Sequence, residues 1–420
     1  MRILVCLFIC INSFAQNDKY VLLKADRVFD GDVMNVGWSV LVKNNMIEEV
    51  GMIKTIPANT QVINIKGTLL PGLIEGHSHL FLHPYNEVSW NDQVLKESRA
   101  ERTARAVNHA KATLLAGFTT VRDLGTEGAM YDDAGLKKVI EKGVIPGPRM
   151  IIASRAIVAK GSYGPKSESA EIDVPQGAAE VSGSDEMARE VRLQISKGAD
   201  VIKLYADYRW GRDGESRPTF SIEEMSVAVN IAKSSGRQVV AHASTAEGMR
   251  RAVIAGVSTI EHGDNGTPEI FKLMKDRNVA LCATIGAGDA VSQYNGWKKG
   301  VDFEPVRIVN KRKTFAMALQ AGVTICFGGD VGVFTHGDNA REMELMVEYG
   351  MKPLDVLRSA TAINADAFDY ATSFGRLQKG LLADIIAVEG NPADDIKNIR
   401  KIQLIMKDGV LYKTPIVQGK

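Results

Sequence analysis

The sequence has little cysteine, no large surplus of either charge and, beyond its first fifteen residues, no apolar run long enough to cross a bilayer. Only four cysteines occur among 420 residues, and a chain of this length is expected to build its core without disulfides. No cluster of lysine or arginine indicates a surface for nucleic acid or anionic lipid. We therefore expect a soluble globular protein with a small-molecule partner, no nucleic acid and no stable membrane span.

Residues 1–15 have the pattern of a secretory signal peptide. Arg2 gives a short positive start, Ile3 to Ile11 is mostly apolar, and Ser13-Phe14-Ala15 puts small residues before a cut at Gln16. The apolar run is too short for a membrane span, which needs about 20 residues. We expect cleavage near Ala15 and export to a periplasm or the medium. Lipoprotein processing at Cys10 is the alternative, although a bulky isoleucine precedes that cysteine.

Cleavage would leave a chain without net charge and with two cysteines. Without Arg2 the 51 basic residues become 50, which equals the 50 acidic residues. Cys282 and Cys326 both lie in apolar, strand-like runs. We interpret them as buried core thiols, with a disulfide or a thiolate ligand as the alternative.

Both ends of the mature chain have β texture. Residues 16–70 contain short β runs separated by turn formers, and residues 371–420 contain two more runs and a hairpin-like Lys407-Asp408-Gly409. We expect the two ends to build one small β-sandwich domain.

Between them, residues 71–370 alternate apolar strands with amphipathic helices such as Glu186 to Ser196 and Ile222 to Ser234. The candidate strands are 73–79, 119–124, 150–154, 201–205, 239–242, 259–262, 279–284 and 324–329. Eight strands with helical crossovers over roughly 300 residues predict an α/β fold, a (β/α)8 TIM barrel. A doubly wound open sheet is the rival, but no Gly-rich phosphate loop follows the first strand.

Polar residues with ligand chemistry lie at or near the carboxyl ends of five of these strands, which is where barrel enzymes build their sites. They are His77, His79, Lys203, His242, His262 and Asp330. A single histidine at a strand end is more often a hydrogen-bonded core group than a ligand. A lysine within an apolar strand is harder to explain by packing, because burying an unpaired ammonium is costly. The six residues together therefore indicate a functional site.

Several segments resemble the amidohydrolase superfamily. Residues 71–79 (PGLIEGHSH) resemble its first-strand metal motif, and residues 117–125 (GFTTVRDLG) and 260–263 (IEHG) resemble later segments. Further similarity covers 336–340, 360–365 and the return to the β unit at 375–384. The sequence looks most similar to the imidazolonepropionase-like group that contains Xaa-Pro dipeptidases.

The resemblance implies a centre of two divalent metal ions. His77 and His79 would bind the more buried ion, and His242 and His262 the more exposed one. Lys203 matches the position of an N6-carboxylated lysine that bridges both, and Asp330 would bind the buried ion and transfer protons. Zinc suits this ligand set, with manganese, cobalt and iron as alternatives. A hydroxide bridging the two ions would attack the carbonyl.

Substrate contacts are expected from residues around this centre. Tyr205 lies two residues after Lys203 and should point to the same side of the strand. The other candidates are Arg209, Arg122 and His336, each of which could instead serve as an ion pair or loop support. The aromatic and charged loop that follows Lys203 departs from the small, Gly-rich loop of many dipeptidase-like relatives.

We therefore expect an exported binuclear hydrolase of a small peptide-like substrate, such as an Xaa-Pro or related dipeptide or an N-acyl amino acid. The alternative substrates are a cyclic amide, a lactone or a phosphoester on the same centre. A metal-bearing binding protein without catalysis is the remote alternative. Homo-oligomers are compatible with the sequence.

Overall fold

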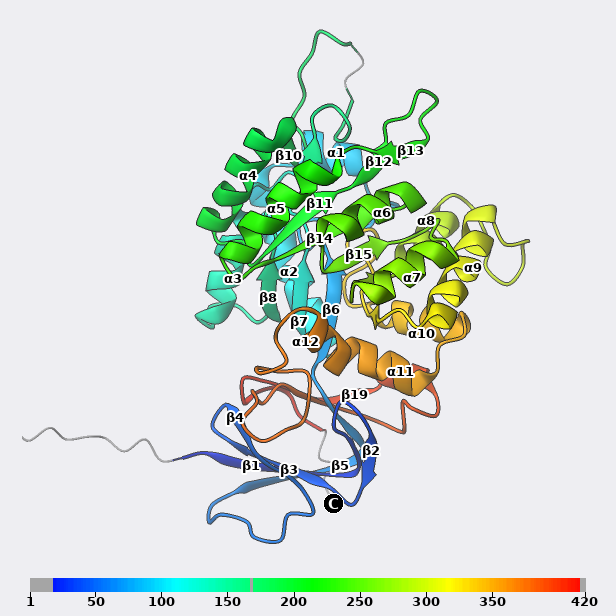
Figure 1. The fold of residues 1–420 in the computed structure, drawn as a ribbon. Coiled ribbons are helices and arrows are strands. Elements are labelled where there is room, and N and C mark those ends of the chain that lie inside the picture. The colour runs from blue at the N-terminus through cyan, green and yellow to red at the C-terminus, as the bar shows by residue number, and fades with distance from the viewer. Residues whose placement is uncertain (1–17, 167–168, 416–420) are drawn as a thin grey trace, which may run out of the picture.

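The computed structural model describes residues 18–166 and 169–415, which form a β unit below an α/β unit (Figure 1). The predicted signal peptide, with Cys6 and Cys10, lies outside the described residues. In the part of the chain that the structure describes, no helix is long and apolar enough to span a membrane. Cys282 and Cys326 are buried free thiols, as predicted.

The β unit contains strands from both ends of the chain in one hydrogen-bonded sheet. Its strands are β1 (Tyr20–Phe29), β2 (Met34–Val36), β3 (Ser39–Lys43), β4 (Met46–Gly51), β5 (Gln61–Pro71), β18 (Ile385–Val388), β19 (Ile402–Lys407) and β20 (Val410–Lys413). They run in the order β20-β19-β18-β5-β1-β3-β4, with β2 on β1. The two ends therefore combine as predicted, but hydrogen bonds join all the strands instead of leaving two separate sandwich sheets.

The α/β unit contains parallel strands whose carboxyl ends point away from the β unit. They are β6 (Leu73–Ser78), β7 (Phe118–Asp123), β8 (Arg149–Ile152), β9 (Ile157–Ala159), β10 (Ala179–Val181), β11 (Val201–Tyr205), β14 (Gln238–Ala243), β15 (Thr259–His262), β16 (Ala280–Cys282) and β17 (Ile325–Cys326). One sheet holds β6-β7-β8, and a second runs β10-β9-β11-β14-β15-β16-β17. A parallel bridge between Ser78 and Val331 joins the first strand to the segment after the last. A hydrogen bond of 2.7 Å from Asp200 N to Ile152 O links β8 to the start of β11.

Helices cover the outside of these strands (Figure 1). They are α1 (Trp90–Lys96), α2 (Arg99–Leu115), α3 (Asp132–Glu141), α4 (Gly183–Lys197), α5 (Ile222–Ser234), α6 (Ala246–Ala255), α7 (Pro268–Asp276), α8 (Ile285–Tyr294), α9 (Val306–Ala321), α10 (Ala340–Glu348), α11 (Pro353–Arg358) and α12 (Asn364–Ala367). The predicted helix 222–234 coincides with α5. Ser221 and Glu224 form its capping box, and Met225, Ala228 and Ala232 form its buried stripe.

A π-helical turn, η1 (Ser359–Ile363), joins α11 to α12 and precedes a buried asparagine clasp. The Asn364 side-chain amide donates to the carbonyl oxygens of Ile74 (3.0 Å) and Phe327 (2.8 Å) and accepts from the Phe327 N–H (3.0 Å). One side chain thus fixes β6 against the segment after β17. These two segments carry His77 and Asp330, so the clasp sets their relative position.

A buried carboxyl on α10 caps the amino-terminal end of α8. Glu342 accepts hydrogen bonds from the N–H groups of Ile285 (2.9 Å) and Gly286. Burial raises the pKa of Glu342 from 4.5 to about 8, although these N–H donors lower it in part. The folded protein therefore keeps a proton on this group at pH values where an unfolded chain has released it.

We expect the Glu342→Gln variant to lose part of the pH dependence of stability. Between pH 5 and 8 the folded wild type binds more protons than the unfolded chain, so its free energy of unfolding falls by up to about 1.4 kcal/mol per pH unit through this group. Glutamine cannot titrate, so the free energy of unfolding of the variant should rise relative to that of the wild type as pH rises. Urea denaturation at pH 5, 6, 7 and 8 measures it. Parallel pH profiles would contradict the assignment.

Candidate metal centre

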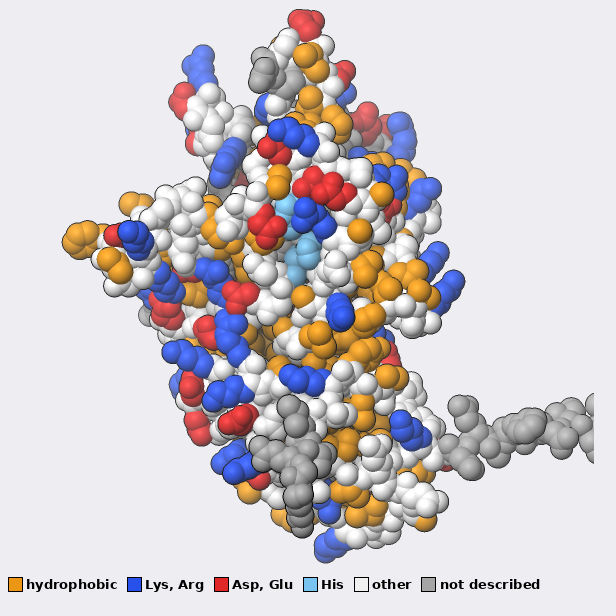
Figure 2. Space-filling model, turned by 180° about the vertical axis from the view of Figure 1, so that it is seen from behind, with side chains coloured by type: hydrophobic (Ala, Val, Ile, Leu, Met, Phe, Trp, Pro, Cys, Tyr) orange, Lys and Arg blue, Asp and Glu red, His pale blue; other side chains and the backbone are white. Residues whose placement is uncertain are grey.

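The predicted ligands lie together at the carboxyl ends of the strands. Histidine side chains are visible in a recess in the middle of one face, surrounded by acidic and basic side chains (Figure 2). His77 is carried by β6, Lys203 by β11, His242 by β14 and His262 by β15, while His79 and Asp330 follow β6 and β17. Five strand ends therefore converge on one site.

Contacts connect all six residues. The His79 Nε2 atom lies 3.3 Å from Asp330 Oδ1, and the His77 Nε2 atom lies 3.7 Å from the same oxygen. Lys203 Nζ is 3.5 Å from His77 Nε2. The ring of His262 is centred 5.1 Å from that of His77 and 4.5 Å from that of His242. The structure therefore brings the whole predicted set together.

Burial and mutual repulsion keep most of these imidazoles neutral. Burial, followed by the charge of Lys203, lowers the pKa of His77 to about 4. Burial also lowers the pKa of His242 to about 4 and that of His262 well below its ordinary value. Neutral imidazole is the form that binds a metal ion. These three rings are therefore in their ligand form at neutral pH.

His79 and Asp330 form a charged pair instead. Burial would lower the pKa of His79, but the hydrogen bond and charge of Asp330 outweigh it and raise the pKa to about 9. Burial would raise the pKa of Asp330, but His77 and His79 hold it at about 2. Asp330 is thus a carboxylate throughout the neutral range. A metal ion that binds His79 would have to displace its proton.

The donor set fits divalent metal ions. Ligand atoms of His77, His262 and Asp330 all lie within 4.8 Å of one another. Imidazole nitrogen with carboxylate oxygen is the mixed set that zinc and related ions accept. Lys203 is buried, and burial lowers its pKa to about 8. Its only described hydrogen-bond partner is His77, so a permanent ammonium would have few partners at this buried position.

Three of the histidines are oriented from behind. The Nδ1 atom of His77 lies 2.8 Å from Glu261 Oε2, and that of His79 lies 2.8 Å from the Gly125 carbonyl oxygen. The Nδ1 atom of His262 lies 2.7 Å from Thr284 Oγ1. Such partners fix the tautomer and leave Nε2 free for a ligand. The sequence interpretation did not single out Glu261, although a glutamate inside an apolar strand is as unusual as Lys203.

The predicted substrate role of Arg122 does not agree with its position. Its guanidinium is buried behind His77, where it donates to Glu261 Oε1 (2.9 Å) and to the Gly76 carbonyl oxygen (2.7 Å). It also lies 3.8 Å from the ring centroid of Phe368. Arg122 therefore neutralises Glu261 within the core of the strands and has no open path to a substrate.

His336 also lies apart from the open site. It is buried, its ring stacks on His109 at 4.2 Å between centroids, and its Nε2 atom lies 3.0 Å from the Leu82 carbonyl oxygen. Its predicted substrate contact is thus replaced by packing under the loop after β6.

Tyr205 lies beside the histidines, whereas Arg209 lies on a hairpin that begins two residues after Tyr205. The Tyr205 ring stacks on His242 with 4.5 Å between centroids and 12° between planes. Arg209 is exposed at the end of β12 (Asp207–Arg209), which forms a hairpin with β13 (Ser216–Pro218). Asp207, which the sequence interpretation missed, anchors this hairpin by accepting hydrogen bonds from Ser244 and Thr245.

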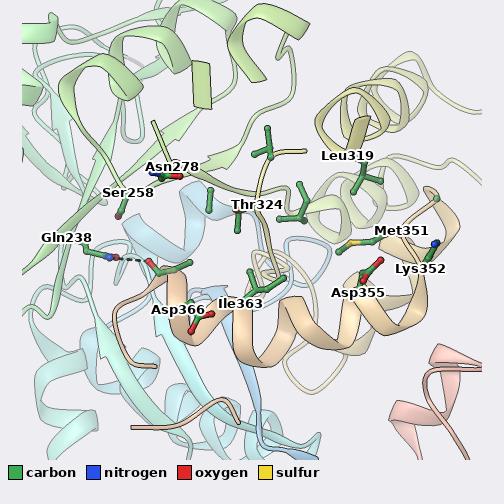
Figure 3. A pocket seen from close by; sticks show the side chains of 15 residues that line it. Gln238, Ser258, Asn278, Leu319, Thr324, Met351, Lys352, Asp355, Ile363 and Asp366 are labelled. Carbon is green, nitrogen blue, oxygen red and sulfur yellow. Dashed lines mark hydrogen bonds between the residues drawn. The ribbon is translucent and has the colours of Figure 1, made fainter. Parts of the chain in front are cut away.

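A separate cavity of about 810 Å³ lies at the opposite ends of the strands (Figure 3). Gln238, Ser258 and Thr324 line it from the amino-terminal ends, and Ile363 and Asp366 line it from the helix below. None of the six clustered residues lines this cavity. In barrels and in open parallel α/β sheets alike, ligands bind at the carboxyl ends of the strands, so the centre described above is the candidate active site.

Comparison with known proteins agrees with this site. Residues 68–420 match the model of the amidohydrolase family. Ochratoxinase of Aspergillus niger is 30% identical over 413 residues, which cover 90% of this chain and 83% of that protein. A solved structure of an Xaa-Pro dipeptidase with methionine in its active site is 32% identical, with a TM-score of 0.82 over 94% of this chain and 100% of that chain. A prolidase complexed with N-methylphosphonate-L-proline is 25% identical, with a TM-score of 0.82 and the same coverage. The chain belongs to the amidohydrolase family.

Proposed function

We propose that the protein is an exported binuclear metallohydrolase that cleaves an amide bond in an Xaa-Pro or related dipeptide or in an N-acyl amino acid. The observation that carries this proposal is the convergence of His77, His79, Lys203, His242, His262 and Asp330 at one set of strand ends. Membership of the amidohydrolase family supports hydrolysis of a carbon–nitrogen bond. The relatives named as Xaa-Pro dipeptidase, prolidase and ochratoxinase support a small substrate.

Two divalent ions are assigned to the centre, with zinc as the first candidate. His77, His79 and Asp330 would hold one ion, His242 and His262 the other, and N6-carboxylated Lys203 would bridge them. The chemistry supplied by bound ions is a lowered pKa for water and polarisation of the scissile carbonyl. The closed (β/α)8 barrel is part of the proposal, and the parallel Ser78–Val331 bridge supports it.

The residues of the chain handle the proton and the substrate. Asp330 has its carboxylate at the centre and accepts the proton of the attacking water, then delivers it to the leaving nitrogen. Its low pKa keeps it ready as a base at neutral pH. Tyr205 stacks on His242, and Arg209 is exposed on the hairpin that follows it; these two are the remaining candidates for contact with substrate.

We expect the mature protein, loaded with zinc or manganese, to hydrolyse members of a library of L-dipeptides and N-acyl amino acids that includes proline and basic C-terminal residues. Chelation should abolish the activity and either metal should restore it, because no serine or cysteine nucleophile is assigned. Ninhydrin detection of released amino acid measures it. The matched control is Lys203→Arg, which keeps a cation but cannot be carboxylated, and which should stay inactive after metal is added.

No turnover by protein with two metals per chain would contradict the amide proposal. Lactones, cyclic amides and phosphoesters would then be the substrates to test. Export has its own test, since the N-terminal residue of the protein recovered from outside the cytoplasm should be Gln16 if cleavage follows Ala15.

A further inference from the structure

Four aromatic side chains form a wall beside the metal centre. The wall consists of Trp90, Tyr163, Tyr205 and Tyr208. The ring of Tyr163 is centred 5.2 Å from that of Trp90, 4.7 Å from that of Tyr205 and 4.7 Å from that of Tyr208. Tyr163 and Tyr205 are buried, whereas Trp90 and Tyr208 are only partly buried. The wall therefore begins at the candidate active site and continues into the core.

A carboxylate with one unused oxygen stands behind this wall. Glu127 is 2% exposed, and its Oε2 atom accepts hydrogen bonds from Trp90 Nε1 (3.0 Å) and the Tyr163 hydroxyl (2.7 Å). Its Oε1 atom is buried and has no hydrogen-bond partner among the described residues. Arg102 lies nearby, but its described hydrogen bonds go to the carbonyl oxygens of Phe81 and Thr126. A buried acceptor without a donor is costly, so a native protein rarely keeps one without a structural or functional reason.

The carboxylate and the wall both connect to the metal centre. Tyr205 stacks on His242, and Lys203 Nζ lies 5.7 Å from the centroid of the Tyr205 ring. Glu127 and His79 both lie against Gly125. A β-carbon on that glycine would be 3.0 Å from Glu127 Oε1 and 3.4 Å from His79 Cε1. The negative charge is thus buried within the same group of side chains as the reacting centre.

We propose that the aromatic wall, backed by Glu127, binds an ammonium group of the substrate next to the scissile carbonyl. Aromatic faces attract cations, and a carboxylate behind the rings adds attraction through a medium that screens charge poorly. The ammonium need not contact Glu127, because the ring of Tyr208 is only partly buried and its exposed face can bind the ammonium directly. The inference rests on the proposed amide hydrolysis and narrows its substrate to peptides with a free α-amino group rather than N-acyl amino acids.

A matched pair of substrates tests the inference. L-leucyl-L-phenylalanine carries the ammonium, and 4-methylpentanoyl-L-phenylalanine has the same shape without it. In the metal-loaded wild type we expect kcat/KM to favour the ammonium substrate by about tenfold or more. Glu127→Gln keeps an acceptor for Trp90 and Tyr163 but removes the charge, so this preference should fall by about tenfold, mainly through KM. Turnover of the neutral substrate should change by less than about threefold.

Glu97→Gln is the control variant. Glu97 also has a buried carboxylate oxygen without a hydrogen-bond partner, but it pairs with His83 and lies outside the wall. Its substitution should leave the ratio of the two kcat/KM values unchanged. Should Glu127→Gln fail to fold, Tyr208→Leu provides the second variant, because loss of a partly buried ring is tolerated and should reduce the same ratio.

The possible outcomes separate the two proposals. An unchanged ratio in Glu127→Gln, or equal losses on both substrates, would overturn the ammonium site and leave the amide hydrolase standing. A wild type that prefers the neutral substrate would do the same. A wild type with two metals that hydrolyses neither substrate, nor any other amide, would overturn the proposed function and this inference with it.

Discussion

Asp330→Asn is expected to lower kcat/KM for the best amide substrate by about 100- to 10,000-fold, which is the range for loss of a general acid–base group. Asparagine preserves the shape of the side chain but cannot accept and return a proton. It also suits the backbone, because residue 330 has a φ of 61° and asparagine tolerates this left-handed conformation better than most residues. The loss should therefore come from chemistry and not from unfolding. Initial rates at pH 7 with saturating metal measure it.

The matched control for this prediction is Asp338→Asn in the same loop region. Asp338 forms ion pairs with Arg341 and Arg400 on the surface, away from the six clustered residues. Its substitution should change kcat/KM by less than about twofold, because exposed ion pairs contribute little. Metal content must be measured for both variants. Wild-type activity in Asp330→Asn with full metal content would refute the assigned role of Asp330.

Glu261→Leu is expected to destabilise the protein by about 3–5 kcal/mol, the range for removal of one partner from a buried ion pair. Glu261 is fully buried, and Arg122 followed by His77 holds its pKa far below the ordinary value in spite of burial. Without it the Arg122 guanidinium would stay buried with no carboxylate, and His77 would lose the partner of its Nδ1 atom. Urea denaturation of wild type and variant at pH 7 measures the difference.

A second substitution distinguishes this mechanism from simple loss of packing. In the Glu261→Leu/Arg122→Met double variant no charge is left unpaired, so much of the lost stability should return. Activity should stay low in both variants, because His77 has lost its orienting partner. A single variant that loses less than about 1 kcal/mol would contradict the assignment of a tightly coupled buried pair.

The strands of the α/β unit could be predicted from the sequence because each is a short apolar run between turn formers. The predicted 201–205 and 259–262 coincide with β11 and β15. The third predicted strand, 150–154, corresponds to β8, which ends at Ile152, and β9 begins only at Ile157. The hairpin of β12 and β13 was missed. Their residues are few and mixed in polarity, so no alternation of period two marks them.

The convergence of the six polar residues followed from their positions at strand ends, whereas their partners could not be predicted in the same way. Which carboxylate contacts His77 depends on the register between β14, β15 and β6, and periodicity does not contain that information. The same limit explains Arg122, for which the sequence left a substrate contact and an ion pair open, and for which the structure shows the ion pair with Glu261. Glu127 lies in an irregular segment after β7, and Asp207 begins the three-residue strand β12, so in neither place does a pattern indicate the direction of a side chain.

The pairing of β5 with both β1 and β18 constrains the order in which the chain folds. Pro71 is opposite Ile385, so the last partner of β5 leaves the ribosome only after the whole α/β unit has been made. Until then one edge of β5 exposes backbone groups and the buried residues Leu69 and Leu70, which is the kind of edge that other chains can pair with. Closing so long a loop is slow, because its entropy is lost before any contact forms. A chain truncated before β18 would keep all six clustered residues and yet be prone to aggregate through β5.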